Sequence, residues 1–406
     1  IGFSHVRYYN KNFKSYFGCT PLQYRKKYYL NENDFDKSKN VTSLDLNGAL
    51  NLLSYNLENY DRFNFENKLW NIHINMDESL NIFDNNFKDI LNLGEAFDLL
   101  IEDNKDILEE VQEEIHFTYG RLEKMFHNDM GVFIDSDFYN WNRAKAVLEF
   151  LYDIDIKPLI VIDNTAFTTE KYTNVLKSFI EYFSALDFSP IEDLKFQFSS
   201  TISKEIKNYL LDFLNNEFSF EVLQDDFVIE NTLNQIYDTS YMLPYIIHNT
   251  IFKKDNLSFL RNFDVLEKAT NITNEVFIGA PGIVNDMGIR KPSYYAFYLL
   301  SKLANEIVSI DDGCIVTKSD DLYAILLYCH NNDMDSLAKY ESIYKNGILK
   351  KSFKKKYSLN IANLKSATRI ITYTIDESTG SSYNYWLSMG SPKRLNKEEK
   401  EILHKA

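Results

Sequence analysis

Residues 141–162 read WNRAKAVLEFLYDIDIKPLIVI and carry the pattern that decides the fold. Val147, Leu148 and Leu151 recur at helical spacing, which predicts a helix over residues 141–152 with one buried face. Pro158 then introduces the continuous apolar run 159–162, which is typical of a strand that is buried on both faces. A helix followed by a fully buried strand is the repeating unit of a parallel α/β sheet.

Similar strand and helix patterns continue on both sides of this unit. The sequence predicts strands over 87–93, 117–122, 194–198 and 220–223, weaker strands over 263–266 and 276–278, and helices over 105–115, 172–183, 202–214 and 232–252. Parallel strands joined by right-handed crossovers form either an open sheet or a closed barrel. We therefore predict an α/β fold with a (β/α)-barrel-like domain over residues 81–305, with the completeness of its eight units left open.

Both ends of this domain are flanked by segments with the pattern of antiparallel strands. They comprise 41–46 and 69–75 before the domain, and 314–317, 323–329, 357–361 and 367–373 after it. We predict that residues 41–80 and 306–406 together form an accessory antiparallel β-sandwich, which ends in a closing helix. The polar residues 31–40 are predicted to be a linker.

The first thirty residues, IGFSHVRYYNKNFKSYFGCTPLQYRKKYYL, differ from the rest of the chain in charge. They hold six lysines and arginines and no acid, although the whole chain has a net charge of −15. Ser4 is a candidate helix N-cap, Gly18 a stop, and Thr20-Pro21 a second helix start, which predicts two short helices joined by a turn. A basic block on an acidic protein indicates binding to a phosphate backbone, with a merely solvated basic helix as the alternative.

The sequence of this segment resembles the end of the DNA-binding domain in AraC/XylS-type transcription regulators. The matching residues are Phe13-Lys14, Gly18, Thr20-Pro21 and Tyr24-Arg25. The resemblance implies that residues 1–30 are the C-terminal part of such a domain, in a chain that lacks the first of two helix-turn-helix units. It also implies contacts with double-stranded promoter DNA from His5, Val6, Arg7, Asn10 and Lys11, with Lys14 and Arg25 near the DNA backbone.

A second resemblance covers residues 70–400. The run Gly288–Phe297, GIRKPSYYAF, is similar to the GxxKPxYxAF run of family-39 glycoside hydrolases, which include β-xylosidases and α-L-iduronidases. The resemblance implies a (β/α)8 barrel with a β-sandwich built from both chain ends. Further matches to the family are Arg121, Asp129-Met130, Asp238-Thr239, Trp386, Met389-Gly390 and Pro392.

The catalytic positions of that family match less well. A retaining glycosidase uses two carboxyl groups, one protonated and one nucleophilic. In this resemblance Thr201 stands at the position of the acid, Asp225 falls near the nucleophile, and Glu123 replaces a histidine of the sugar pocket. We therefore predict that the chain is not an enzyme. A ligand cleft at the C-terminal ends of the strands is predicted from Glu123, Asp163, Thr201 and Asp225, with solvated loop acids as the alternative.

Composition sets the remaining limits. Three widely spaced cysteines indicate a reducing, cytoplasmic compartment, and no apolar run reaches the roughly 18 residues that a membrane span needs. The seven histidines are scattered without HExxH or CxxC motifs, so no metal or cofactor is predicted.

These observations together predict an AraC-family transcription regulator whose glycosidase-like, non-catalytic domain senses a small, sugar-like ligand or a protein partner. A homodimer, no membrane association, and a relationship to staphylococcal surface-protein and biofilm regulators are part of this prediction. Two alternatives stay open: an active glycoside hydrolase with a DNA-binding appendage, and a barrel that serves only as a dimerisation or interaction platform.

Overall fold

The chain divides into two compact units, Ile1–Leu69 and Trp70–Ala406. The computed structural model describes residues 13–15, 69–135, 138–186, 191–223, 233–253, 257, 259–264, 276–320, 322–330, 355–364, 369–376 and 379–406. Residues 13–15 are helical. The remainder of the predicted helix-turn-helix, the linker 31–40 and the strand 41–46 lie outside the described residues, and the predicted domain boundaries stay predictions.

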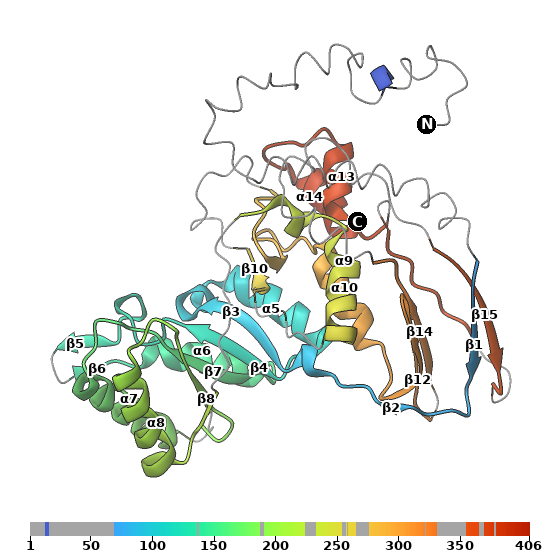
Figure 1. Ribbon diagram of the computed structural model, residues 1–406. Coiled ribbons are helices and arrows are strands. Elements are labelled where there is room, and N and C mark those ends of the chain that lie inside the picture. The colour runs from blue at the N-terminus through green and yellow to red at the C-terminus, as the bar shows by residue number, and fades with distance from the viewer. Residues whose placement is uncertain are drawn as a thin grey trace, which may run out of the picture. The chain divides into compact units, whose positions relative to one another are not determined.

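A parallel sheet forms the centre of Trp70–Ala406 (Figure 1). Its seven strands lie in the order β11-β10-β3-β4-β7-β8-β9, and every pairing between them is parallel. This confirms the predicted α/β fold. The strands are β3 (Ile90–Glu95), β4 (Tyr119–Glu123), β7 (Lys157–Ile162), β8 (Lys195–Phe198), β9 (Glu221–Leu223), β10 (Arg261–Phe263) and β11 (Gly282–Val284).

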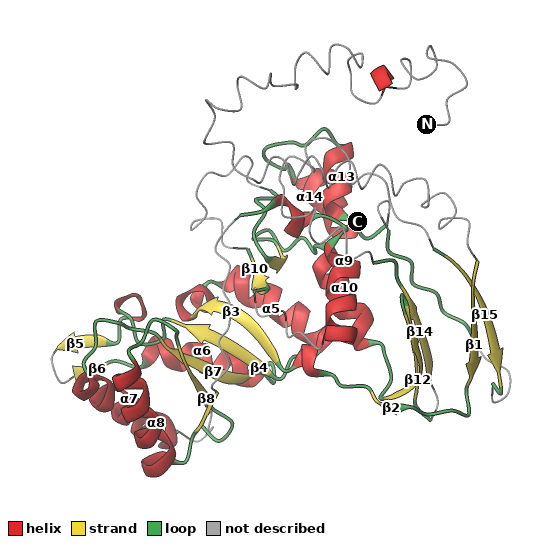
Figure 2. Cartoon of the chain, in the orientation of Figure 1, coloured by secondary structure: helices red, strands yellow, loops and turns green. Residues whose placement is uncertain are grey.

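Helices alternate with these strands along the chain (Figure 2). Their apolar stripes are buried, as in α7, where Tyr172, Leu176 and Phe179 are fully buried in the main apolar core. Thr168 begins α7 because its side chain accepts a hydrogen bond from the Lys171 amide. The helices are α5 (Glu102–Ile115), α6 (Asn142–Asp153), α7 (Thr169–Ser184), α8 (Lys204–Phe218), α9 (Met242–His248) and α10 (Pro292–Ser301).

The two faces of the parallel sheet have different chemistry. Ile160 and Ile162 of β7 belong to the apolar core that the helices cover. The alternate residues Leu159 and Val161 face the other way, and their cross-strand partners are Arg121 and Gln197. The face that turns away from the helices is therefore partly polar.

Two smaller sheets from both ends of Trp70–Ala406 complete the unit, and the four-stranded one is antiparallel. One sheet has the order β14-β13-β12-β2, and β1 pairs with β15. Ile72 and Ile74 of β1 pack with Val308, Cys314 and Val316 of the larger sheet, as in a sandwich. The strands are β1 (Leu69–Asn75), β2 (Asn81–Ile82), β12 (Glu306–Asp311), β13 (Cys314–Lys318), β14 (Tyr323–Leu327) and β15 (Lys356–Ala362), and a separate hairpin is formed by β5 (Phe133–Asp135) and β6 (Phe138–Tyr139).

Two segments differ from the predicted elements. The helix predicted over 232–252 is broken into η4 (Gln235–Asp238), α9 and the π-helical turn η5 (Asn249–Lys253). The strand predicted at 276–278 is irregular, and β11 takes its place in the sheet. Val276 and Phe277 instead pack with Trp386 and Leu403 in a separate apolar cluster, so burial alone explains their apolar character.

The remaining elements are short. Three 3₁₀ turns, η1 (Asn86–Lys88), η2 (Ala96–Leu100) and η3 (Asn128–Met130), follow or precede strands of the parallel sheet. The chain ends in α13 (Ser382–Ser388) and α14 (Lys397–Lys405), and a capping box between Asn396 and Glu399 begins the last helix. Residues 369–376 are described without regular strand structure.

Candidate functional site

Charged side chains gather where three neighbouring strands of the parallel sheet end. Glu95 ends β3, Glu123 ends β4, and Asp163 directly follows β7. Glu95 and Glu123 are register partners. We call this group the edge cluster, and it consists of Glu95, Arg121, Glu123, Lys124, His127, Asp163 and Gln197.

Arg121 lies at the base of the edge cluster and is buried. Its Nε donates to Gln197 Oε1 on β8 over 2.7 Å, and its NH1 donates to Glu123 Oε1 over 2.6 Å. The planar guanidinium thus fixes two side chains in a rigid fork, a geometry that a lysine lacks. The Glu123 side chain keeps 17% of its surface exposed, so its carboxylate can meet a ligand.

Lys124 turns the chain sharply after β4. Its backbone has φ 56°, in the left-handed region that side chains other than glycine seldom adopt. Its amide donates to Asp163 Oδ2 over 2.9 Å, and its Nζ lies 2.7 Å from Glu95 Oε1. The hydrogen bond to Glu95 raises the pKa of Lys124. Lys124 therefore joins the ends of β3, β4 and β7.

Asp163 receives hydrogen bonds on both carboxyl oxygens. Oδ2 accepts from the Lys124 amide, and Oδ1 lies 3.0 Å from Nε2 of His127. Burial raises the pKa of Asp163, and the nearby charge of Glu123 raises it further, while the Lys124 amide and His127 act in the opposite direction. The side chain is 14% exposed, so Asp163 is held mainly by protein groups.

The end of β8 supplies hydroxyl groups. Ser199 Oγ and Thr201 Oγ1 lie 2.8 Å apart, and Thr201 is exposed. The structure thus brings Glu123 and Asp163 together on adjacent strands and places Thr201 after the next strand. Asp225 lies outside the described residues, as do the predicted DNA contacts His5, Val6, Arg7, Asn10, Lys11 and Arg25; Lys14 is helical and exposed.

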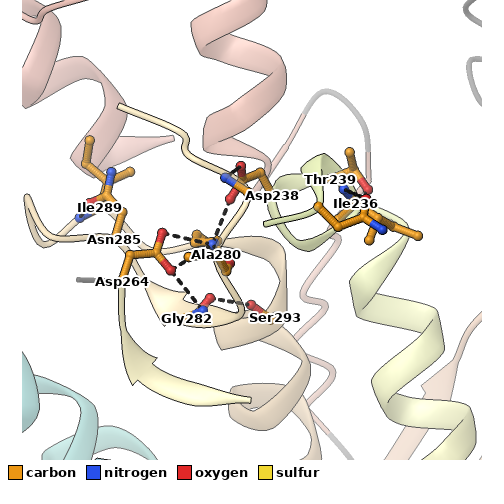
Figure 3. Close-up of polar contacts among 12 residues, drawn as sticks. Ile236, Asp238, Thr239, Asp264, Ala280, Gly282, Asn285, Ile289 and Ser293 are labelled. Carbon is orange, nitrogen blue, oxygen red and sulfur yellow. Dashed lines mark hydrogen bonds and ion pairs between the residues drawn. The ribbon is translucent and has the colours of Figure 1, made fainter. Parts of the chain in front are cut away.

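A second charged group is sealed inside the protein. Asp238, Asp264 and Lys291 have fully buried side chains, and we call them the buried cluster. Figure 3 shows its two aspartates near Ala280. Lys291 Nζ lies 2.7 Å from Asp238 Oδ1, 3.1 Å from Asp264 Oδ2 and 2.7 Å from the Ala280 carbonyl oxygen. Backbone amides of Gly279 and Gly282 donate to the two carboxylates.

Burial dominates the electrostatics of the buried cluster. It raises the pKa of Asp264 to about 7, against the attraction of Lys291. The pKa of Asp238 is also raised by burial, and the two carboxylates raise the pKa of Lys291 against its own burial. Because no member reaches solvent, this cluster joins β10, η4 and α10 structurally and cannot contact a substrate.

Sequence reasoning missed four members of the edge cluster: Glu95, Lys124, His127 and Gln197. Gln197 had a visible signal, because it is a polar residue within the otherwise apolar strand Phe196–Phe198. His127 and Lys124 carry no such signal, since their role depends on a turn that brings them back to Asp163.

Within the described ranges, no helix is both long and apolar enough to span a membrane. No group of three or more His, Cys, Asp or Glu side chains in the same part of the chain is arranged to hold a metal ion.

Comparison with known proteins connects this geometry to a family. The family model for glycosyl hydrolases family 39 matches residues 178–406. A β-xylosidase from Caldicellulosiruptor saccharolyticus is 26% identical over 177 residues, which are 42% of this chain and 33% of the enzyme. An uncharacterised helix-turn-helix-type transcriptional regulator from Staphylococcus aureus strain N315 is 23% identical over 214 residues, which are 50% of this chain and 27% of the regulator. The chain thus spans a third or less of these relatives.

Solved structures share the fold of the chain. A monomeric β-xylosidase from Caulobacter crescentus CB15 superposes with a TM-score of 0.66 at 14% identity, covering 82% of this chain and 92% of the enzyme. A family-39 enzyme from Xanthomonas axonopodis pv. citri gives a TM-score of 0.65 at 12% identity, covering 83% and 90%. The chain therefore shares the fold of these enzymes, a barrel-like parallel sheet with accessory antiparallel strands.

The comparisons correct two predictions. The prediction of a transcription regulator with a non-catalytic domain is wrong, because the family-model match is to a hydrolase family and the similarity to regulators is limited to low-identity, uncharacterised proteins. The prediction that the chain is not an enzyme is also wrong, because the matched family consists of hydrolases, although Thr201, Asp225 and Glu123 depart from its catalytic pattern. The matched segment covers more than half of the sequence. The chain belongs to glycosyl hydrolase family 39.

Proposed function

We propose that the chain is a glycoside hydrolase that cleaves β-linked xylosides or closely related sugars. The observation that carries the proposal is the edge cluster, in which carboxylates gather at the C-terminal ends of strands in a family-39 fold. The similarity to a β-xylosidase supports the choice of sugar.

Glu123 is the proposed catalytic carboxylate among the described residues. Arg121 holds one of its oxygens, and its remaining exposed surface lies at the end of β4. The hydroxyls of Ser199 and Thr201 are suited to hydrogen-bond sugar hydroxyls, since each can donate and accept. Asp163 completes the predicted cleft behind Glu123.

Glycoside hydrolysis requires a second carboxyl group. One carboxyl protonates the leaving oxygen as the glycosidic bond breaks, and the other attacks the anomeric carbon or activates the water that does so. We propose that this partner is an acid of residues 224–232, which contain Asp225, Asp226 and Glu230.

Hydrolysis of a panel of nitrophenyl glycosides tests the proposal. We expect release of nitrophenol from the β-xyloside and a fall of about 10²–10⁴-fold in kcat for Glu123→Gln, which removes the charge and keeps the shape. The same assay on Asp225→Asn, Asp226→Asn and Glu230→Gln identifies the second carboxyl group.

Glu109→Gln is the matched control, because Glu109 is an exposed residue of α5. Its activity should equal that of the unaltered chain. No hydrolysis of any glycoside in the panel, with the protein folded, would contradict the proposed function.

Binding partners are proposed separately from the hydrolase activity. Double-stranded DNA is proposed for the basic residues 1–30, and a sugar-like small molecule for the barrel-like domain. A DNA-binding assay at several salt concentrations tests DNA binding, and Arg7→Ala and Lys11→Ala should both weaken it.

Homodimer formation and a cytoplasmic location are also proposed. Analytical ultracentrifugation tests the first, and cell fractionation tests the second.

A further inference from the structure

We infer that Asp163 is a positioning residue: its carboxylate clamps the turn that follows β4 and thereby fixes the direction of Glu123. This inference rests on the proposed hydrolase function for its effect on activity. The clamp itself is defined by the two hydrogen bonds of Asp163 to residues 124 and 127.

The backbone conformation of Lys124 shows why a clamp is needed. A lysine with φ 56° is strained, and such a conformation persists only where the surrounding structure holds it. Asp163 Oδ2 binds the amide of this residue, directly after Glu123. If this hydrogen bond were lost, Lys124 could relax to a more common conformation, and the preceding carboxylate would turn with it.

The C-terminal end of the turn, at Phe126 and His127, is held by residues that follow β7. His127 Nε2 binds Asp163 Oδ1, and the side-chain amide of Asn164 donates to the Phe126 carbonyl over 2.9 Å. Asn164 is held in turn, because its own carbonyl accepts from the Tyr172 hydroxyl of α7. Asp163 and Asn164, just after β7, therefore fix the conformation of the turn after β4.

The clamp depends on the charge of Asp163. A carboxylate can accept both hydrogen bonds, whereas a protonated carboxyl loses acceptor capacity on one oxygen. The charged and titratable groups around it are Glu123, Lys124 and His127 on the β4 turn, Glu95 on β3, Asp129 on η3 and Tyr172 on α7. Because burial and Glu123 raise the pKa of Asp163, the clamp should open at a higher pH than an ordinary aspartate would allow.

Three variants separate the clamp from general structural damage. Asp163→Asn keeps an oxygen for the Lys124 amide but presents to His127 an NH2 group that cannot accept a hydrogen bond, so it should hold the turn only partly and to the same extent at every pH. Asp163→Ala removes both contacts. Lys124→Gly combined with Asp163→Ala relieves the backbone strain, since glycine adopts positive φ freely.

Amide hydrogen exchange of Lys124 is the primary readout, because it does not depend on catalysis. In the unaltered chain we expect the Lys124 amide to be protected at neutral pH and to lose protection as pH falls through the Asp163 titration. Asp163→Asn should show the same partial protection at all pH values tested, and Asp163→Ala should lose about tenfold or more. Equal exchange in the unaltered chain and Asp163→Ala would overturn the inference.

Kinetics on the β-xyloside supply the second readout. We expect Asp163→Ala to lower kcat by about 10–100-fold with a smaller change in KM, and Asp163→Asn to abolish the acid limb that Asp163 contributes to the pH profile. The double variant should recover part of the lost kcat.

The two readouts distinguish failure of the inference from failure of the proposed function. If the unaltered chain hydrolyses no glycoside but the Lys124 amide behaves as expected, the clamp stands and the hydrolase proposal fails. If hydrolysis is observed and Asp163→Ala keeps full kcat, Asp163 does not position Glu123.

Discussion

The edge cluster and the buried cluster are built from the same kinds of residue and differ in their access to solvent. Each places carboxylates beside a cation. In the buried cluster every side chain is sealed and every carboxylate also binds a backbone amide. In the edge cluster Glu123 and Asp163 retain exposed surface. A charge sealed from water can contribute to stability alone, while one at the rim can also meet a ligand.

Loss of the buried cation should have the largest effect. Lys291→Met leaves two buried carboxylates without their partner, and breaking a buried ion pair from one side costs about 3–5 kcal/mol. We expect the free energy of unfolding, measured with urea, to fall by this amount. Activity per folded molecule should stay unchanged, and a selective loss of activity in a stable protein would contradict the division between the clusters.

Arg121→Lys should have the opposite effect to Lys291→Met, because it should lower activity more than stability. Lysine keeps the charge but lacks the planar fork that holds Gln197 and Glu123 together. We expect kcat on the β-xyloside to fall by about 10–100-fold and the free energy of unfolding to fall by about 1–2 kcal/mol. Comparison of steady-state kinetics with urea unfolding on the same samples measures both. Full activity would show that Arg121 does not orient Glu123.

The pH dependence of stability gives a smaller but specific signature of burial. The pKa of Asp264 is raised to about 7, so the folded protein holds a proton that the unfolded chain releases near pH 4. Asp264 therefore contributes stability that is fully present below pH 4 and is lost as pH rises toward 7, at no more than about 1.4 kcal/mol per pH unit.

Asp264→Asn should remove this contribution. The difference in free energy of unfolding between the unaltered chain and the variant, measured by urea titration from pH 4 to 8, should change across this range. A constant difference would show that Asp264 does not change its protonation there.

The smallest effect is expected at an exposed pair of the same chemistry. Lys145 and Glu149 of α6 lie 3.3 Å apart with 36% and 43% of their side chains exposed. Lys145→Met should change the free energy of unfolding by less than about 0.5 kcal/mol, because water screens such pairs. It is the matched control for Lys291→Met, and a loss comparable to the buried variant would undermine the role given to burial.

The predictable part of the fold was the part that depends on local apolar pattern. The buried run 159–162 became β7, and the stripe of Tyr172, Leu176 and Phe179 became one face of α7. The helix predicted over 232–252 failed because the segment also has to deliver Asp238 to the buried cluster, and a long-range ion pair leaves no periodic trace in the sequence.

The candidate site was predictable only in part for the same reason. Glu123 and Asp163 were identified because each ends or follows a recognisable strand, and the structure brings them together. His127 and Lys124 were missed because their contacts with Asp163 depend on a left-handed turn, which nothing in a lysine indicates. The absence of a glutamate at Thr201 was given too much weight against the rest of the family pattern.

The hydrogen bond from Arg121 to Gln197 also closes off part of the sheet interior. It runs from β4 to β8 and passes over the intervening strand β7, on the face that turns away from the helices. Both side chains are buried, so protein groups fill this part of the polar face. In the proposed hydrolase a sugar would therefore have to bind at the strand ends and not within the interior of the sheet.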